Sequence, residues 1–231
     1  MPISNLLIKG FQPDDRDALV SLCSPVQFSL GDTLCAPGDH LSHLLFVRSG
    51  IISIVTEMSD GRSVEAYMVG FEGMTGASAT VVPASSHSRH VAQAAGSALR
   101  IEAGAYRALA GSRASVRAIV GGYSAGLHTE LEQSTACNAL HHAEQRLAKW
   151  LLRCHDRVAG DIILLTQEYL ATMLGAQRTT VNEGAQTLQA VGAISCSRGK
   201  LTILDRTALE HAACECYRAT GVGQEPDISE D

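Results

Sequence analysis

The fold is decided by one stretch, residues 165–183, which reads LTQEYLATMLGAQRTTVNE. Thr166 is suited to start a first helix, because a threonine hydroxyl at that position accepts a hydrogen bond from a free backbone N–H. Gly175 is suited to end the helix, because glycine adopts the positive φ that helix ends often require. A second helix then begins near Arg178. The stretch therefore predicts two helices joined by a tight turn, which is the helix-turn-helix motif.

The predicted second helix has an apolar face and a polar face. Val181, Ala185 and Leu188 recur at helical spacing and are expected to hold the helix to a core. The polar face carries arginine, asparagine and glutamate, which in the major groove of DNA can bind guanine, adenine and cytosine, respectively. Residues 194–204 then predict a hairpin with basic residues at its tip, a wing suited to phosphate contact.

Short strands are predicted from about Phe28 to about Ile101, where β-branched runs alternate with turn signals. One strand is expected at residues 44–47 and another at 51–55, with a turn at 48–50 between them. Many short strands joined by turns predict a small barrel or roll.

A long helix is predicted to follow from about Ala105, because the apolar period changes toward 3.6. Three glycines within it, Gly121, Gly122 and Gly126, cost roughly 3 kcal/mol relative to alanine, so another interaction must offset them. Two identical helices packed together could do so, and the alternatives are a helix lying on its own roll or a break. The residues expected at the dimer interface are Val116, Val120, Tyr123, Leu127 and Leu131.

The composition excludes several classes of protein. A chain of 231 residues that is 45% hydrophobic is long and apolar enough to fold as one large domain or two small ones. No apolar run approaches the roughly 18 residues that cross a bilayer, and the N-terminus lacks the pattern of a signal peptide, so we expect a cytoplasmic protein without a membrane partner. Seven irregularly spaced cysteines favour reduced thiols over a disulfide framework.

The net charge of −6 includes an acidic end, residues 219–231, expected to be a solvated tail.

The order of these features resembles the Crp/Fnr family of bacterial transcription regulators over residues 10–218. The turns at residues 31–32, 37–39 and 46–50 resemble those of the family's cyclic-nucleotide-type β-roll. The resemblance implies an α+β fold with an N-terminal, jelly-roll-like β-roll, a long dimerisation helix and a C-terminal winged helix-turn-helix. It also implies a homodimer that binds a palindromic operator in double-stranded DNA, with RNA polymerase as a further candidate partner. The corresponding domains are residues 1–110 for the roll, 111–137 for the dimerisation helix and 138–218 for the DNA-binding domain.

The resemblance also assigns roles to residues of the DNA-binding motif. Arg178 falls on the family's guanine-reading arginine, and Thr166 falls on a residue that contacts phosphate. Glu183 stands where a founding member has a second arginine, and Thr179 replaces a common glutamate, so base preference should differ. The residues expected to contact DNA are Thr166, Gln167, Arg178, Thr179, Thr180, Asn182, Glu183, Arg198 and Lys200.

The effector of the roll is not identified by the sequence. Family members that bind cyclic AMP hold the ribose with a Gly-Glu pair and the phosphate with an Arg-Ser pair. Here Met74 stands at the glutamate position and His87 at the arginine position, unless Arg89 points inward as a substitute. Loss of the charged phosphate contact costs about 1.5–3 kcal/mol, so cyclic AMP binding in the usual mode is not expected. The candidate effector-pocket residues are Met74, Thr75, His87, Ser88 and Arg89.

No metal or other cofactor is expected from the cysteine and histidine spacing. Cys23 and Cys35 do not supply the four thiolates of an iron–sulfur cluster, and no spacing singles out a haem ligand. His211, Cys214 and Cys216 are soft zinc ligands, but on one continuous helix Cys216 points roughly 140° away from His211. We therefore expect these cysteines to be ordinary core residues.

Enzymatic activity is not expected, because the sequence lacks a Gly-x-Ser-x-Gly elbow, a phosphate-binding loop with Lys-Ser/Thr and a metalloprotease His-Glu pair. The alternative function is a dimeric effector-binding sensor or adaptor with little or no DNA binding. It stays open because residues 166–204 are only weakly basic, with Arg178, Arg198 and Lys200 set against two glutamates.

Overall fold

The computed structural model describes residues 5–219, except the side chains of Gln167 and Glu168. The chain divides into two compact units, an N-terminal unit of residues 1–129 and a C-terminal unit of residues 130–231. The acidic end at 220–231 lies outside the described residues. No helix in the described part of the chain is long and apolar enough to cross a membrane.

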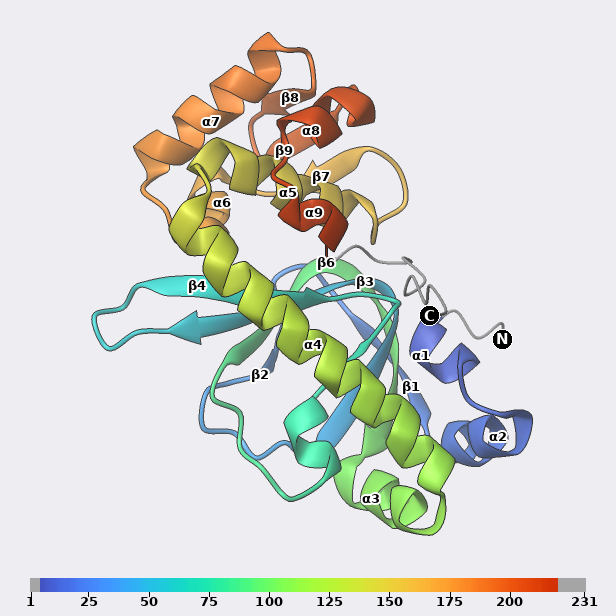
Figure 1. The fold of residues 1–231 in the computed structure, drawn as a ribbon. Helices are drawn as coiled ribbons and strands as arrows, with labels where there is room; N and C mark the ends of the chain where they lie inside the picture. The colour runs from blue at the N-terminus through green and yellow to red at the C-terminus, as the bar shows by residue number, and fades with distance from the viewer. Residues whose placement is uncertain (1–4, 220–231) are drawn as a thin grey trace, which may run out of the picture. The chain divides into compact units, whose positions relative to one another are not determined.

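The N-terminal unit is an antiparallel β-roll (Figure 1). Its six-stranded sheet has the order β1-β6-β3-β4, with β2 paired to β6 and β5 paired to β3. Two buried clusters fill it, one around Phe46, Ile101 and Tyr106 and the other around Val47, Ile52 and Val69. The elements are α1 (Leu6–Lys9), α2 (Pro13–Ser21), β1 (Ser24–Phe28), β2 (Thr33–Cys35), β3 (His43–Glu57), β4 (Ser63–Val69), β5 (Met74–Thr75), the 3-10 turn η1 (Ala77–Thr80), β6 (Arg89–Glu102) and α3 (Ala103–Ser112). The predicted roll is confirmed.

The predicted turn at residues 48–50 is wrong, because β3 runs through it as one strand of 15 residues. Its register against β6 shifts at Val47/Ser49, Ser49/Ile51 and Ile51/Ile52, so the turn-like residues form bulges. Gly50 has a φ of 80°, and a Cβ at Gly96 would lie 1.9 Å from the Ser49 carbonyl oxygen. The two glycines therefore allow β3 and β6 to approach more closely than side chains would permit.

The predicted long helix is interrupted once. After α3, Arg113 adopts an extended conformation, and α4 (Ala114–Leu140) then runs for 27 residues. The division between the two units falls inside α4.

The first three residues of the predicted dimer stripe on α4 face the chain's own roll, which corrects the prediction. Val116 and Val120 are buried in the core of the roll, and Tyr123 packs against the same cluster. The Tyr123 hydroxyl donates to the Met74 carbonyl oxygen at 3.0 Å. The roll therefore covers Val116 and Val120, whereas Tyr123, Leu127 and Leu131 are half-buried, and a dimer contact through Leu127 and Leu131 stays a prediction.

The C-terminal unit is a winged helix-turn-helix, as predicted. The three-stranded sheet has the order β7-β9-β8. After the end of α4, its elements are α5 (Ala143–His155), β7 (Ile162–Leu164), α6 (Gln167–Leu174), α7 (Arg178–Ala190), β8 (Ile194–Ser197), β9 (Lys200–Ile203), α8 (Arg206–Ala212) and α9 (Cys216–Ala219).

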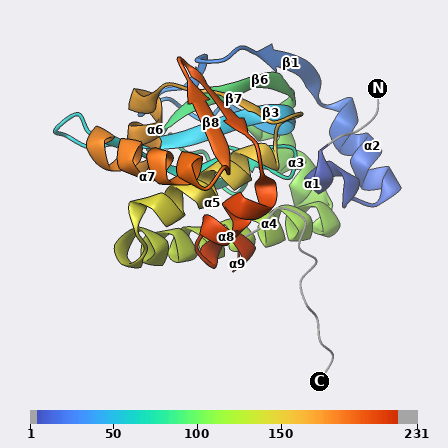
Figure 2. The ribbon, with the colours of Figure 1, turned by 90° about the horizontal axis from the view of Figure 1, so that it is seen from above.

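The end of this unit is predicted by the sequence to be one continuous helix through His211, Cys214 and Cys216. It forms two short helices instead, α8 and α9 (Figure 2). Ala213 breaks it with extended dihedrals, φ −74° and ψ 152°. The directions of Cys214 and Cys216 therefore do not follow helical spacing. The continuous helix on which the predicted divergence of His211 and Cys216, roughly 140°, is based is absent.

Because β3 and β6 approach closely at Gly96, we expect a larger residue there to destabilise the protein. Gly96→Ala should lower the free energy of unfolding by about 1–3 kcal/mol or more, because its methyl group would overlap the Ser49 carbonyl. Gly111→Ala on α3 meets no atom within 4 Å and should raise stability by about 0.5–1 kcal/mol. Chemical denaturation of both variants measures the difference, and an unaffected Gly96→Ala protein would contradict the packing.

Candidate nucleic-acid interface

The turn between α6 and α7 is set by two residues. The Thr166 hydroxyl accepts a hydrogen bond from the Tyr169 backbone N–H at 3.1 Å, which caps the start of α6. Gly175 ends α6 in the left-handed conformation, with φ 59° and ψ 35°. Both roles match the prediction from the sequence. Leu170 and Leu174, on the inner face of α6, are buried.

Helix α7 is fixed by close packing on α5. Val181, Ala185 and Leu188 are buried as predicted. Gly184 lies between them, and a Cβ there would be only 3.3 Å from the Glu144 Cα. The Arg146 guanidinium of α5 also donates to the Leu174 carbonyl oxygen at the end of α6. These contacts fix which face of α7 is outward.

The outward face carries most of the predicted DNA-contacting side chains. Arg178, Thr179, Thr180 and Glu183 are exposed, as is Thr166 at the start of α6. The first four of these residues occupy the first two turns of α7, the part of a recognition helix that reaches base edges in helix-turn-helix complexes. Gln167 lies on α6, but its side chain is outside the described residues.

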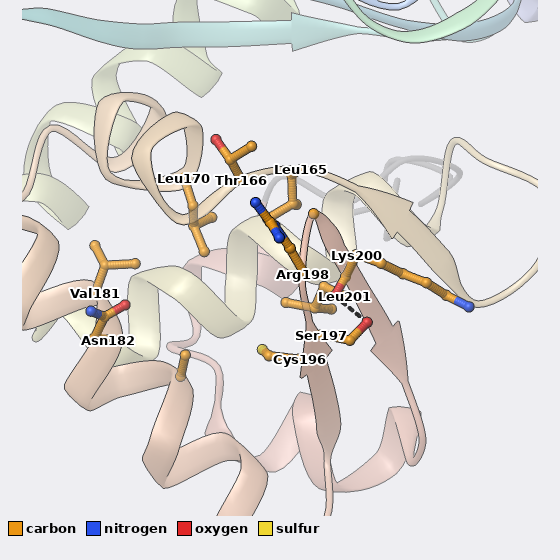
Figure 3. Close-up of a pocket in the computed structure, with 12 residues that line it drawn as sticks. Leu165, Thr166, Leu170, Val181, Asn182, Cys196, Ser197, Arg198, Lys200 and Leu201 are labelled. Carbon is orange, nitrogen blue, oxygen red and sulfur yellow. Dashed lines mark hydrogen bonds between the residues drawn. The ribbon is translucent and has the colours of Figure 1, made fainter.

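Asn182 differs from the prediction, because it is half-buried rather than fully outward. Its side-chain oxygen is buried and has no hydrogen-bond partner among the described residues. The side chain lines a hollow of about 480 Å³ between α6, α7 and the wing (Figure 3). An unsatisfied buried acceptor costs about 1–3 kcal/mol, so this arrangement of the side chain is locally unfavourable.

The wing is the hairpin of β8 and β9, with Arg198 and Lys200 beside Gly199 at its tip. Gly199 has a φ of 72°, which suits a tight hairpin turn. The Cys196 N–H of the wing donates to the Gln189 Oε1 on α7 at 2.9 Å. The Leu165 N–H, between β7 and α6, donates to the Gly199 carbonyl of the wing at 3.1 Å. Both Arg198 and Lys200 line the hollow, and in Figure 3 the Lys200 side chain extends away from Asn182. The tip of the wing therefore carries two positively charged side chains, Arg198 and Lys200.

The residues predicted for the effector pocket have different surroundings. Thr75 lines a hollow of about 190 Å³ in the roll, with His90, Arg100 and Cys35 among the other lining residues. Met74 is buried in the core cluster. Burial lowers the pKa of His90 to about 4, so this histidine is neutral at physiological pH.

The predicted phosphate segment does not provide an inward-facing cation. Arg89 does not point inward as a substitute; its Nε lies 2.7 Å from the Glu57 Oε1 in an ion pair between β3 and β6. His87, at the arginine position, is exposed. Ser88 is buried, and its hydroxyl is 3.1 Å from the Thr56 hydroxyl.

One group of residues was missed by the sequence analysis. Cys137, His141, Cys214 and Cys216 lie together in the C-terminal unit, with one potential ligand atom of each within 4.8 Å of the others. The sequence signals are a Cys-x-x-x-His pair at the end of α4 and a Cys-x-Cys pair after α8. Neither pair is diagnostic alone, and the two pairs lie far apart in the sequence. Only the folded chain brings them together.

Two domain families match the chain. Residues 25–113 match the cyclic nucleotide-binding domain, and residues 145–212 match the Crp-like helix-turn-helix domain. Among curated proteins, none matches this chain.

Solved structures of the same fold include FixK2 from Bradyrhizobium japonicum, with a TM-score of 0.68, 16% identity, and coverage of 83% of this chain and 98% of that one. A Crp/Fnr-family protein from Eubacterium rectale has a TM-score of 0.70, 20% identity, and coverage of 89% and 96%. TTHB099, a CRP-family transcriptional regulator from Thermus thermophilus, has a TM-score of 0.69, 20% identity, and coverage of 81% and 96%. At these identities the likeness establishes the fold.

The two matched domains lie in the same order as the roll and the winged helix-turn-helix and together span more than half of the chain. With this domain pair and this fold, the chain belongs to the Crp/Fnr family of transcription regulators.

Proposed function

We propose that this protein is a homodimer that binds a two-fold symmetric site in double-stranded DNA through α7 and the wing. The observation that carries the proposal is the outward face of α7, where Arg178, Thr179 and Glu183 are exposed while the opposite face is locked onto α5. Such a helix presents base-reading side chains in a fixed orientation.

The charges near this face favour DNA binding that depends on base sequence over strong, non-specific binding to phosphate. Arg178, Arg198 and Lys200 supply positive charge, and Glu183 on α7 opposes it. Non-specific affinity for phosphate should therefore be modest, and discrimination should depend on base contacts from both halves of a dimer. The same weak charge favours the second candidate, a sensor or adaptor that does not bind DNA, and binding to random duplexes at low ionic strength separates the two.

The proposed dimer contact is the open face of α4, opposite the residues that cover the roll. Ala118, Gly121, Gly122 and Ala125 are exposed there, and a Cβ at either glycine would meet no atom within 4 Å. Small residues let two helices approach closely, which would offset the low helix propensity of the glycines.

We also propose that the roll does not bind cyclic AMP in the usual mode. In the segment that the resemblance assigns to the phosphate, Arg89 is paired with Glu57 and His87 is exposed. A cyclic phosphate at this segment would therefore lack the charged partner that makes its burial favourable. Arg100, which lines the hollow beside Thr75, lies outside the segment.

Arg178→Ala should weaken binding by about 1–3 kcal/mol per half-site and relax selection at one base pair, because a two-pronged contact with guanine is lost. Selection from randomised duplexes measures both effects. Arg62→Ala, which removes an equal charge from an 84% exposed side chain in the roll, is the control and should leave the preference unchanged. An unaltered preference in the Arg178 variant would refute its base-reading role.

Lys200→Gln should weaken binding to all DNA sequences by similar factors and reduce the salt dependence by about one phosphate contact. Titrations at several salt concentrations on specific and random duplexes measure this. A loss restricted to the specific duplex would show that Lys200 contacts bases instead.

Ala125→Glu should shift the protein toward monomer, because two like charges would face each other across the proposed α4 contact. Sedimentation equilibrium measures the change in association constant, expected to be about tenfold or more, which corresponds to roughly 1.4 kcal/mol. Val81→Glu places the same charge at an 81% exposed site in the roll and should leave the dimer intact. If Ala125→Glu dimerises normally, the contact lies elsewhere.

A further inference from the structure

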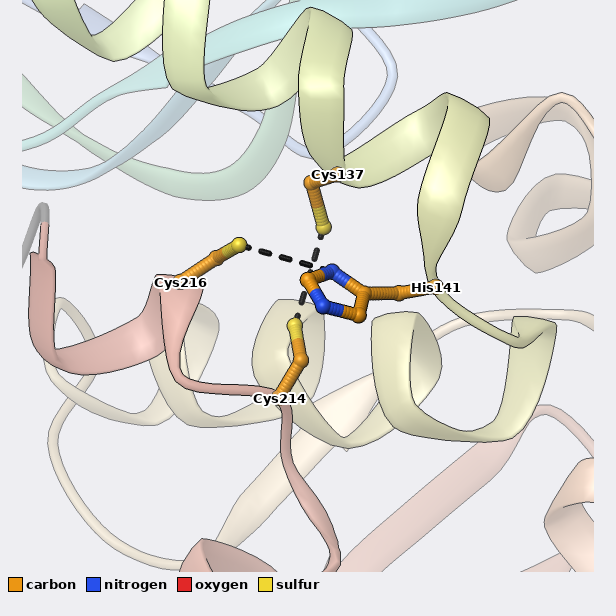
Figure 4. Close-up of side chains that lie close together, drawn as sticks. All are labelled: Cys137, His141, Cys214 and Cys216. Carbon is orange, nitrogen blue, oxygen red and sulfur yellow. Dashed lines mark hydrogen bonds between the residues drawn. The ribbon is translucent and has the colours of Figure 1, made fainter.

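Three thiols and one imidazole converge in the C-terminal unit (Figure 4). The Cys137 and Cys214 sulfurs are 3.6 Å apart, and the Cys216 sulfur is 3.5 Å from the His141 Nδ1. The three cysteines are buried and form a core cluster of their own. The side chain of His141 is 18% exposed.

The local structure explains why they converge. Cys137 lies in the last turn of α4 and His141 directly follows the helix. The His141 N–H still donates to the Cys137 carbonyl oxygen at 3.1 Å, as in a helical turn, so the two side chains lie on one face. Cys214 and Cys216 lie where the chain leaves α8 through the extended Ala213 and enters α9. This break turns both thiols toward the end of α4.

Two distances in the cluster, 3.6 Å between the Cys137 and Cys214 sulfurs and 3.5 Å between the Cys216 sulfur and the His141 Nδ1, are close to those around a tetrahedral zinc ion, and all four atoms lie within 4.8 Å of one another. Zn–S bonds of about 2.3 Å place two sulfurs about 3.8 Å apart, and a Zn–N bond of about 2.0 Å places sulfur and nitrogen about 3.5 Å apart. A disulfide would need a sulfur–sulfur distance of about 2.05 Å. The spacing of 3.6 Å between Cys137 and Cys214 is therefore compatible with two ligands of one ion and too long for a disulfide.

The surrounding side chains suit a metal-bound state. His141 turns its Nδ1 toward the thiols, and its Nε2 is 3.1 Å from the Glu215 carboxylate. Metal-binding histidines usually donate their second ring N–H to such a carboxylate, which fixes the ring orientation.

Two further donors face the sulfurs. The Gln133 side-chain amide donates to the Cys216 sulfur at 3.0 Å, and the buried Lys149 ammonium donates to the Cys137 sulfur at 3.2 Å. Three thiolates and one Zn²⁺ carry a net charge of −1, so the lysine would neutralise the site. A buried lysine beside neutral thiols is otherwise unfavourable.

We propose that Cys137, His141, Cys214 and Cys216 bind one Zn²⁺ in a closed, structural site. Thiolates and imidazole select a soft or borderline metal over Mg²⁺ or Ca²⁺, and four protein ligands leave no open position for catalysis. The ion would join the end of α4 to the C-terminal segment of the DNA-binding unit. The site does not depend on DNA binding and is tested without DNA.

The test is metal analysis of the full-length protein, purified under reducing conditions, followed by Co²⁺ substitution. We expect one zinc per chain, and on substitution the visible d–d bands of tetrahedral Co²⁺ together with thiolate-to-cobalt charge transfer. Reduced protein that holds no zinc and gives no such spectrum with added Co²⁺ would overturn the proposal.

Variants identify the ligands. Cys214→Ser should abolish the charge-transfer spectrum or greatly reduce it, whereas Cys196→Ser, which removes a thiol of the wing, should preserve it. His141→Cys should retain Co²⁺ binding with stronger charge transfer, because a fourth thiolate replaces the imidazole. Unchanged spectra in both Cys214→Ser and His141→Cys would show that the metal binds elsewhere.

Glu215→Gln keeps all four ligands, so it tests the site without removing one. We expect zinc affinity, measured by chelator competition, to fall about 10–100-fold, because the carboxylate that orients His141 is lost. An unchanged affinity would contradict the proposed orientation of the imidazole.

Discussion

The packing of α7 on α5 is the constraint on which the proposed interface depends. Gly184 lets the two helices approach, and Val181 and Leu188 bury the stripe around it. Because a helix with one buried stripe has only one outward face, this packing alone decides that Arg178 and Glu183 are exposed. The hydrogen bonds from the wing to Gln189 and Leu165 then place the basic hairpin beside that face.

The sequence predicted most reliably what is determined locally. Thr166 and Gly175 act within one or two turns of their own positions, so the start and end of α6 followed from residue type. The burial of Val181 and Leu188 followed from helical period. These are the features that also produce the resemblance to the Crp/Fnr family.

Features set by distant residues were not predicted. The turn-like residues 48–50 lie inside β3 because β6 presents Gly96 opposite them, which no local pattern reveals. The apolar stripe of α4 is equally suited to a second helix or to the roll, and the roll takes Val116 and Val120. The cysteine cluster was missed because it needs both a helix break at Ala213 and a contact between segments far apart in the chain.

The buried oxygen of Asn182 makes the unliganded interface locally unfavourable. In a major groove, adenine and cytosine offer amino groups to such an acceptor, whereas guanine and thymine present carbonyl oxygens at the corresponding edge. In the proposed DNA complex, if the Asn182 side chain turned this oxygen toward a base edge, a mismatched base would be disfavoured by repulsion between two oxygens as well as by a missing bond. The penalty in the free protein is the same for every base, so selectivity at that position would come from the difference between the matched complex, which relieves it, and the mismatched complex, which does not.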